Sequence, residues 1–324
     1  GGRATIVVAE DDLQRVRLVQ ARESGGFGLD GVWNDDFHHS ARVALAGRNE
    51  AYLSGYRGKP QEFISALKYG YLYQGQWNSW KKGRRGTADF RIPHSAFVIC
   101  LQNHDQVANS GRGERSHMLA GPGLYRAMTA LLLLAPCTPM LFQGQEFASS
   151  SPFIYFADFE GELKQLVREG RFRTLAEFRS LATAEGQAAL ADPGDPETFN
   201  RCKLDFSERR SHAGIYRMHR DLIRLRRELL IDFAEIDGAV LSEEAFVLRY
   251  FNEGDDRLLL VNLGLDLALN PAPEPLLAPP SRYHRWESNW SSEDPHYGGT
   301  GTAQIETEQG WLIPGHAAVL LRAK

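Results

Sequence analysis

Four short apolar segments of the 324-residue chain each end at a cluster of polar side chains that includes a carboxylate. In chain order, the segments and the clusters that follow them are residues 4–9 with Glu10, Asp11 and Asp12, residues 31–33 with Asn34, Asp35 and Asp36, residues 96–102 with Asn103, His104 and Asp105, and residues 138–143 with Gly144, Gln145 and Glu146. Carboxylates that meet around one substrate can serve as acid, base or nucleophile, and glycoside hydrolysis with retention uses two of them about 5 Å apart. Hydrolysis of a sugar substrate is therefore one candidate chemistry.

Glu10 and Asp105 are the carboxylates that we assign to this chemistry. A further carboxylate in such a site stabilises the positive charge of the transition state, and His104 stands beside Asp105, where it could donate to a sugar hydroxyl. The alternative interpretation is structural, because Asp residues at strand ends often cap the next helix or lie in solvated loops. Asp12 and Asp36 fit this alternative.

Helix-like segments separate the apolar segments, which predicts alternating strands and helices. Residues 60–74, which begin with Pro60, and residues 122–135 have the pattern of helices. Residues 4–9, "ATIVVA", are apolar without alternation, so we expect a strand buried on both faces. Polar groups at the C-terminal side of every strand are typical of a (β/α) barrel.

The chain changes character after residue 150. Residues 158–182 and 213–229 have amphipathic helical patterns, and alternation from residue 235 predicts strands. One hairpin is expected around Asn252–Asp256, and a Pro-rich extended segment follows at 270–280. These patterns predict a small antiparallel β domain at the C-terminus.

The predicted fold class is α/β, with part of a (β/α)8 TIM barrel in residues 1–234 and an all-β antiparallel sandwich in residues 235–324. A complete barrel needs eight strand–helix units and about 250 residues. Four strand ends fall within the first 150 residues, and half a barrel would expose unpaired sheet edges. We therefore expect the chain to be the C-terminal part of a longer enzyme.

Composition argues against several other classes. The net charge of −4, without a basic stripe, disfavours a nucleic-acid partner, and no apolar stretch has the length of about 18 residues that a membrane span needs. The three cysteines, Cys100, Cys137 and Cys202, show no zinc-ligand spacing and predict a cytoplasmic protein, and the apolar surroundings of Cys100 and Cys137 predict buried thiols at these two positions. Residues 81–85, "KKGRR", are interpreted as a solvated loop, with an anion site as the alternative.

Five stretches together resemble one family. They are "VVAE" at 7–10, "WNDDFHHS" at 33–40, "LQNHDQVANSGRGER" at 101–115, "LFQGQEF" at 141–147 and "PFIYFADFEGELKQLVREGR" at 152–171. The chain resembles the malto-oligosyltrehalose trehalohydrolases, which are glycoside hydrolases of the α-amylase superfamily. The Asn-His-Asp strand end marks the superfamily, whereas "DDFHH" and "FADFEGEL…VREGR" narrow the resemblance to this family.

The resemblance implies a role for each cluster. Glu10, closing the fifth barrel strand, resembles the general acid/base, and Asp105, after the seventh strand, resembles the transition-state stabiliser. The family's nucleophile is an Asp at the end of the fourth strand, a position that precedes Gly1, so the chain would hold strands 5–8. Two segments resemble substrate-binding segments and contain Asp35, Asp36, Phe37, His38 and His39, and His104, Gln106, Val107, Ala108 and Asn109. No cofactor and no metal is implied.

Other side chains in these regions have competing interpretations. His38 and His39 are adjacent and should not share one helix face, so we predict hydrogen bonding rather than joint metal binding. Trp77 and Trp80 lie in a polar stretch and are candidates for stacking on sugar rings. Glu146 is a candidate contact after the eighth strand, with structural packing as its alternative.

The implied reaction is retaining, endo-acting hydrolysis of the α-1,4 bond next to the terminal trehalose of malto-oligosyltrehalose, which releases trehalose. One alternative is a glucan branching enzyme or α-amylase of the same superfamily. Another is a non-catalytic remnant, or a subunit of a split enzyme, that binds glucan. The expected partners are malto-oligosyltrehalose or maltodextrin and the missing N-terminal half of the same enzyme.

Overall fold

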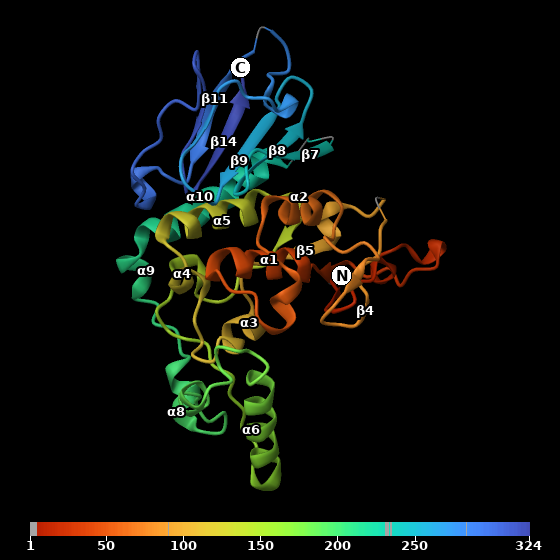
Figure 1. The fold of residues 1–324 in the computed structure, drawn as a ribbon, viewed down its shortest axis with the longest axis vertical. Coiled ribbons are helices and arrows are strands. Elements are labelled where there is room, and N and C mark those ends of the chain that lie inside the picture. Colours follow the sequence, from red (N-terminus) through yellow and green to blue (C-terminus); the bar gives the residue numbers. More distant parts are fainter. Residues whose placement is uncertain (1–4, 90, 231–232, 234, 283) are drawn as a thin grey trace, which may run out of the picture.

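The computed structural model describes residues 5–89, 91–230, 233, 235–282 and 284–324. Figure 1 shows a mixed α/β part in the middle, antiparallel strands at one end, and the helices α6 (Gly161–Leu175) and α8 (Pro196–Arg201) at the other. The predicted start of the first strand at Ala4 and the predicted domain boundary at residue 234 lie outside the described residues. The division into two domains at that boundary stays a prediction.

A four-stranded parallel sheet organises the middle of the molecule. Its strands are β1 (Val8–Ala9), β2 (Gly31–Trp33), β5 (Phe97–Ile99) and β6 (Thr138–Pro139), in the order β1-β2-β5-β6. Each neighbouring pair is parallel. Parallel strands end at one edge of a sheet, so the polar clusters that follow them emerge on one side, as predicted.

The first strand differs from its prediction. The sequence favoured a strand over 4–9 buried on both faces, but β1 has two residues, and Ile6, Val7 and Val8 are 76%, 48% and 42% exposed. β1 is the edge strand, with β2 as its hydrogen-bonded neighbour. The prediction was wrong because burial of an apolar strand depends on the elements that cover it.

Three helices pack together beside the sheet: α1 (Asp35–Ala46), α2 (Pro60–Lys68) and α5 (Pro122–Leu134). The prediction for 60–74 is confirmed at its start, where Pro60 lies in the first turn, but the helix ends at Lys68. Gly70 follows with φ of +86°, a conformation that favours glycine and cannot continue a helix.

Two antiparallel sheets form the C-terminal part. The five-stranded sheet, in the order β11-β14-β9-β8-β7, consists of β7 (Glu235–Val240), β8 (Ala245–Phe251), β9 (Arg257–Asn262), β11 (Trp286–Ser291) and β14 (Ala317–Ala323), and the three-stranded sheet, in the order β10-β13-β12, consists of β10 (Leu267–Leu269), β12 (Glu306–Thr307) and β13 (Gly310–Ile313). The predicted hairpin around Asn252–Asp256 is confirmed, since β8 and β9 pair there. An apolar cluster that includes Trp286 and Trp311 joins the two sheets. The predicted fold class is therefore confirmed.

Helix α5 connects the two parts of the structure. Nearly all of its residues from Tyr125 onward are buried, because α5 packs against α10 (Ala213–Leu229) and against β9 and β14. Arg226 of α10 caps the end of α5: its Nη1 donates to the carbonyl of Leu133 at 3.0 Å and its Nη2 to that of Cys137 at 2.6 Å. The Leu133 carbonyl lacks a partner within α5 and Cys137 follows the helix end, so the cation satisfies the end of α5 and links α10 to it and to the segment before β6.

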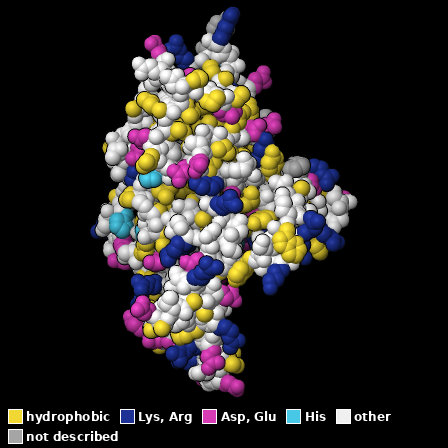
Figure 2. Space-filling view, viewed as in Figure 1, with side chains coloured by type: hydrophobic (Ala, Val, Ile, Leu, Met, Phe, Trp, Pro, Cys, Tyr) yellow, Lys and Arg dark blue, Asp and Glu magenta, His cyan; other side chains and the backbone are white. Residues whose placement is uncertain are grey.

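Helix α6 is more exposed than its sequence indicates. The amphipathic pattern over 158–182 predicts one buried face, but Leu163 and Leu166 are 50% and 55% exposed, and Leu175 is the one buried residue of α6. Figure 2 shows apolar side chains among charged ones at the lower end of the view, where Figure 1 places α6 and α8. Apolar periodicity alone therefore did not determine packing here.

The remaining elements are short. They include α3 (His104–Asn109), α4 (Ser116–Leu119), α7 (Ala184–Ala188), α9 (Glu208–Ser211), several 3-10 helices such as η3 (Ala51–Gly55), and the hairpin of β3 (Trp77–Asn78) and β4 (Gly83–Arg84). Within the described part of the chain, no helix is both long enough and apolar enough to cross a membrane. The thiols of Cys100 and Cys137 are free and buried, as predicted, and so is that of Cys202.

Replacement of Arg126 by Met should destabilise the protein. The buried guanidinium donates to Glu293 Oε1 at 2.6 Å and to the Ser292 carbonyl at 2.9 Å, which joins α5 to the loop after β11. Without it, Glu293 is a buried charge without its partner, which costs about 3–5 kcal/mol of unfolding free energy. Urea denaturation should show this loss, and the double variant Arg126→Met/Glu293→Met should recover part of it. Equal stability of wild type and Arg126→Met would contradict the pairing.

Candidate active site

Glu10 and Asp105 lie at the same edge of the parallel sheet. Glu10 directly follows β1 and is exposed, and Asp105 lies in α3, shortly after β5, with 51% of its side chain exposed. One strand, β2, separates β1 from β5, so their ends are about 10 Å apart at a strand spacing of about 4.8 Å. Both carboxylates are thus open to a ligand at this edge.

Asparagines, not carboxylates, cap the helices that begin here. Asn34 Oδ1 accepts from the backbone N–H of Phe37 at 3.2 Å at the start of α1. Asn103 Oδ1 accepts from the N–H groups of Asp105 and Gln106 at 3.0 and 3.2 Å at the start of α3. A side-chain oxygen at the N-cap satisfies N–H groups that have no partner within the helix. The Asp105 carboxylate is therefore not used as a cap.

The carboxylates beside Glu10 are engaged within the protein. Buried Asp11 accepts from Arg15 Nη2 at 2.8 Å and Nε at 3.0 Å. Burial opposes ionisation of Asp11, but the hydrogen bonds and charge of Arg15 outweigh it and lower the pKa of this carboxyl. Asp12 forms an ion pair with Lys81. Among the described residues, Glu10 is therefore the carboxylate of its cluster that is exposed and has no ion-pair partner.

A buried charge centre lies at the start of α1. Asp36 is fully buried and accepts from the Tyr56 hydroxyl at 2.6 Å and from the Tyr73 N–H at 2.8 Å. Arg85, 3% exposed, lies with Nη2 at 3.4 Å from Asp35 and Nε at 3.5 Å from Asp36. The interpretation of residues 81–85 as a solvated loop is therefore wrong for Arg85. This residue directly follows β4 and is buried against the two carboxylates.

Asp35 binds a proton more tightly than an ordinary carboxyl group. Burial raises its pKa to about 7, opposed by the charge of Arg85 and reinforced by Asp36, Glu10 and Asp12. Its side chain is 17% exposed, so it still reaches the surface of the site. The negative charge of Glu10, the acid/base candidate, contributes to this higher pKa.

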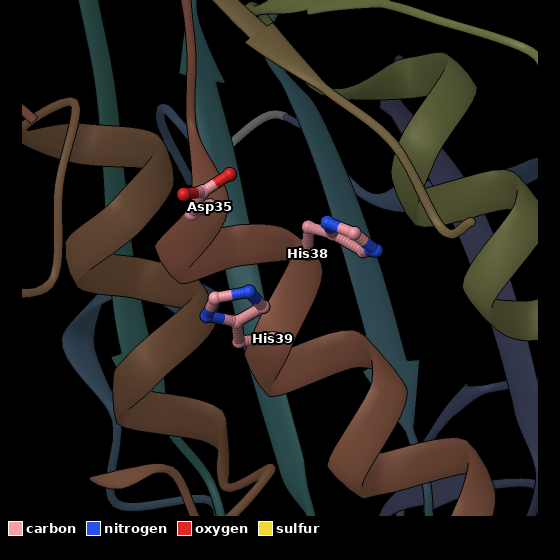
Figure 3. A group of neighbouring side chains, drawn as sticks. All are labelled: Asp35, His38 and His39. Atoms are coloured by element: carbon pink, nitrogen blue, oxygen red, sulfur yellow. The ribbon is translucent and has the colours of Figure 1, made fainter. Parts of the chain in front are cut away.

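His38 and His39 lie closer together than expected of adjacent helix residues, with ring centroids 5.5 Å apart (Figure 3). Burial lowers the pKa of His38 to about 3, with a further contribution from Arg42, and burial also lowers the pKa of His39. Both rings are therefore neutral. Within the described residues, Nε2 of His38 and Nδ1 of His39 have no hydrogen-bond partner.

Arg85 disfavours a metal ion at this cluster. One ligand atom from each of Asp35, His38 and His39 lies within 4.8 Å of the others, so their spacing does not exclude an ion. Arg85 Nη2 lies 3.4 Å from Asp35, and its positive charge would repel a cation. The absence of a metal stays a prediction.

Helix α3 presents its residues to different surroundings. His104 is exposed, with Nε2 3.5 Å from Asp105 Oδ1, and its ring meets Trp33 edge-on at a centroid distance of 6.2 Å. Val107 and Ala108 are buried. His104 is thus placed beside the stabiliser candidate, whereas the side chains of Val107 and Ala108 pack inward.

The sequence analysis missed a hydrogen-bond network at Asn109. Asn109 Nδ2 donates to the Tyr52 hydroxyl at 3.1 Å, and Arg171 Nη1 donates to Asn109 Oδ1 at 2.7 Å. Burial lowers the pKa of Arg171, opposed by the nearby charge of Asp105. The signal was present in the "VREGR" motif, which ends at Arg171.

Other candidates differ in how accessible they are. Phe37 is fully buried and packs edge-on against Phe63 at 5.8 Å. Trp77 and Trp80 are 62% and 39% exposed, as stacking would require. Glu146 is paired with Arg209 at 3.3 Å, which favours its structural interpretation. Contact of any of these residues with a substrate stays a prediction.

Comparison with known sequences identifies relatives. The chain is 38% identical over 272 residues to the malto-oligosyltrehalose trehalohydrolase of Deinococcus radiodurans, which covers 82% of this chain and 44% of that protein. It is 35% identical over 278 residues to the malto-oligosyltrehalose trehalohydrolase of Arthrobacter ramosus. That match covers 84% of this chain and 45% of the Arthrobacter protein. The chain is a relative of the malto-oligosyltrehalose trehalohydrolases. It spans less than half the length of these two trehalohydrolases.

Comparison with solved structures agrees with this relationship. A Salmonella typhimurium protein assigned as an alpha amylase is 25% identical, with a TM-score of 0.78 over 98% of this chain and 51% of that one. The trehalose-6-phosphate hydrolase of Bacillus licheniformis shares the fold. It is 14% identical, with a TM-score of 0.53 over 98% of this chain and 56% of that one. Residues 234–320 match a domain of unknown function (DUF3459). This chain, a relative of the trehalohydrolases, thus has an α-amylase-like architecture.

The carboxyl of Asp35 should titrate near pH 7. Replacing Arg85 by Gln removes the positive charge that lowers this pKa, so the midpoint should move higher. Carboxyl-carbon NMR across pH measures both midpoints. Arg84→Gln is the matched control, because Arg84 is exposed and bonds the Gly75 carbonyl instead. An Arg85→Gln midpoint equal to or below that of wild type would contradict the assignment.

The same group should make stability depend on pH. Asp35 has a higher pKa in the folded state than the value of about 3.9 in an unfolded chain, so its ionisation opposes folding. Its contribution to stability should be full below about pH 4, fall between pH 4 and 7 and stay lost above pH 7. Asp35→Asn should remove this fall, so the unfolding free energy of wild type relative to Asp35→Asn should decrease from pH 4 to pH 8. If this difference in unfolding free energy instead increased from pH 4 to pH 8, the raised pKa of Asp35 would be ruled out.

Proposed function

We propose that this chain carries the acid/base and the transition-state stabiliser of a retaining glycoside hydrolase that releases trehalose from malto-oligosyltrehalose. The observation that carries the proposal is selective exposure at the sheet edge. Glu10 and Asp105 are open to solvent, whereas Asp11 and Asp36 are buried and occupied by hydrogen bonds. The names of the relatives supply the substrate class.

In the proposed reaction, Glu10 first protonates the glycosidic oxygen as the bond breaks. An aspartate from outside the 324 residues attacks the sugar carbon and forms the covalent intermediate. Glu10 then takes a proton from the water that hydrolyses this intermediate. Asp105 stabilises the positive charge that develops on the sugar in both transition states.

Neighbouring groups bind and orient the sugar in this proposal. Exposed His104, beside Asp105, donates to a sugar hydroxyl. Protonated Asp35 adds a second donor close to Glu10, since its pKa of about 7 keeps a large fraction neutral near neutral pH. Asp36 is buried and does not touch the sugar; it holds Arg85 and the start of α1 in position. No cofactor is required.

One rival within the superfamily is an α-amylase or branching enzyme, and the α-amylase-like neighbour from Salmonella typhimurium is the observation in its favour. The products separate the reactions. Incubation of the native polypeptide with malto-oligosyltrehalose should yield free trehalose by chromatography. Branched glucan or short maltodextrins in its place would support the rival, and binding without any product would support a non-catalytic glucan-binding protein.

The polypeptide in its source cells should be larger than this chain. The proposal requires a nucleophile on a strand that precedes residue 1, whereas the chain has a mass of 36.3 kDa. Intact mass spectrometry of the native polypeptide, or of a complex that co-purifies with it, should show roughly 15 kDa or more in addition, as the rest of a barrel requires. A native mass of 36.3 kDa with no partner would exclude the catalytic proposal.

Glu10→Gln in the native enzyme should abolish trehalose release and leave substrate binding nearly unchanged, because the amide cannot transfer the proton. Asp105→Asn should lower kcat by about 10²–10³, as expected from removal of transition-state electrostatics. Glu23→Gln, an exposed residue in the loop before β2, is the matched control. Initial rates of trehalose release provide the measurement. A reduction below about tenfold for either active-site variant would disprove its role.

A further inference from the structure

Arg171 of α6 is a charged side chain that the proposed reaction does not use. It ends the "VREGR" motif, and its helix extends away from the middle of the protein (Figure 1). Leu175 is the one buried residue of α6, yet Arg171 reaches a side chain 62 residues earlier in the chain. Its Nη1 donates to Asn109 Oδ1 at 2.7 Å. Arg171 therefore links α6 to α3, the helix that carries Asp105.

Helix α3 depends on other elements for its position. It has six residues, and isolated helices shorter than about 12 residues are marginal in water. Asn103 satisfies two N–H groups at its start. Asn109, its last residue, donates to the Tyr52 hydroxyl of η3 at 3.1 Å and accepts from Arg171 of α6. The contacts at these two ends hold α3 against its neighbours.

Asp105 and Asn109 lie on the same face of α3. They are four residues apart, a spacing that makes side chains neighbours on a helix. The guanidinium that binds Asn109 is therefore on the side of α3 that carries Asp105. Burial lowers the pKa of Arg171, and the charge of Asp105 is the largest contribution that opposes this shift. The electrostatic interaction agrees with the placement of the two side chains.

The guanidinium of Arg171 is committed to the protein rather than to a ligand. Its Cζ lies 5.1 Å from the centroid of the Tyr155 ring, and Nη1 is used by Asn109. Its Nη2 is buried and has no hydrogen-bond partner among the described residues, so a sugar cannot reach this atom. A buried donor without a partner is unfavourable, so stability alone does not account for a cation here.

We propose that Arg171 is a positioning residue for the transition-state stabiliser: through Asn109 it fixes α3 and thereby holds Asp105 in place at the edge of the sheet. This inference rests on the proposed function, in which Asp105 is the stabiliser. Without Arg171, Asn109 Oδ1 loses its donor and α3 is free to shift. A displacement of about 1 Å at an active site can lower a rate by about 10²-fold. The mostly exposed helix α6 thus contributes to the chemistry of the site.

Kinetics of the native enzyme test this role. Arg171→Met keeps an unbranched side chain but removes the charge and the donors, so kcat for trehalose release should fall by about 10²-fold with KM nearly unchanged. Arg171→Lys keeps the charge and one donor and should recover part of this loss. Arg173→Met is the matched control, since Arg173 is exposed on the same helix. A fall in kcat below about tenfold for Arg171→Met would overturn the proposal.

A double variant distinguishes positioning from a general loss of stability. If Arg171 acts through Asn109, Arg171→Met should lower kcat by less than about tenfold in the background of Asn109→Ala, because the link is already broken. An undiminished second loss of kcat would contradict this route. Thermal melting of each variant shows whether it is folded at the assay temperature.

NMR of the labelled native enzyme separates this inference from the proposed function. The amide groups of Asp105 and Gln106 donate to Asn103 and report where α3 lies. Their signals should shift in Arg171→Met and stay in place in Arg173→Met. Unchanged signals in Arg171→Met would overturn the positioning of α3. If the wild-type enzyme released no trehalose, the proposed function would fail, and these signals would still decide whether Arg171 positions Asp105.

Discussion

Arg85 lies between the carboxylates of Asp35 and Asp36, almost without access to water, and the polar edge of the parallel sheet depends on this contact. Burial of a carboxylate without a partner costs several kcal/mol, so fully buried Asp36, with partly buried Asp35 beside it, requires a cation and further donors. Arg85, with the hydroxyl of Tyr56 and the N–H of Tyr73, meets that requirement. The contact also connects the β3–β4 hairpin to the start of α1.

This arrangement divides the carboxylates into two groups. Asp11 and Asp36 are bonded within the protein and shape the site, whereas Glu10 and Asp105 face outward and are free to act on a ligand. Asp35 belongs to neither group: burial raises its pKa, the charge of Arg85 opposes this, and the charges of Asp36 and Glu10 add to it. One buried guanidinium thus influences both the packing and the proton affinity of the site.

The C-terminal sheets stabilise the opposite side of the barrel-like part. α5 is buried between the helices and the five-stranded sheet, and the guanidinium groups of Arg126 and Arg226 join it to the loop after β11 and to α10. Tyr250 of β8 donates to the carbonyl of Leu134 at 2.7 Å. These contacts fix the last turn of α5 shortly before β6, and so help to define the sheet whose edge carries the site.

The sequence alone determined the features that depend on near neighbours. The strands that precede Glu10 and Asp105, the helix at 213–229 and the hairpin around Asn252–Asp256 follow from local periodicity and turn residues. The motifs quoted from the sequence also indicated the family that the relatives support. The roles of Glu10 and Asp105 rest on that resemblance and are proposals.

Tertiary structure decided which side chains are buried and which are paired. Arg85 looked like part of a solvated run, but it lies against Asp35, 50 residues earlier in the chain. Arg171 reaches Asn109 from 62 residues away, while the apolar residues before β1 and along α6 are exposed. Desolvation and ion pairing act between segments distant in sequence, so neither composition nor local periodicity contains them.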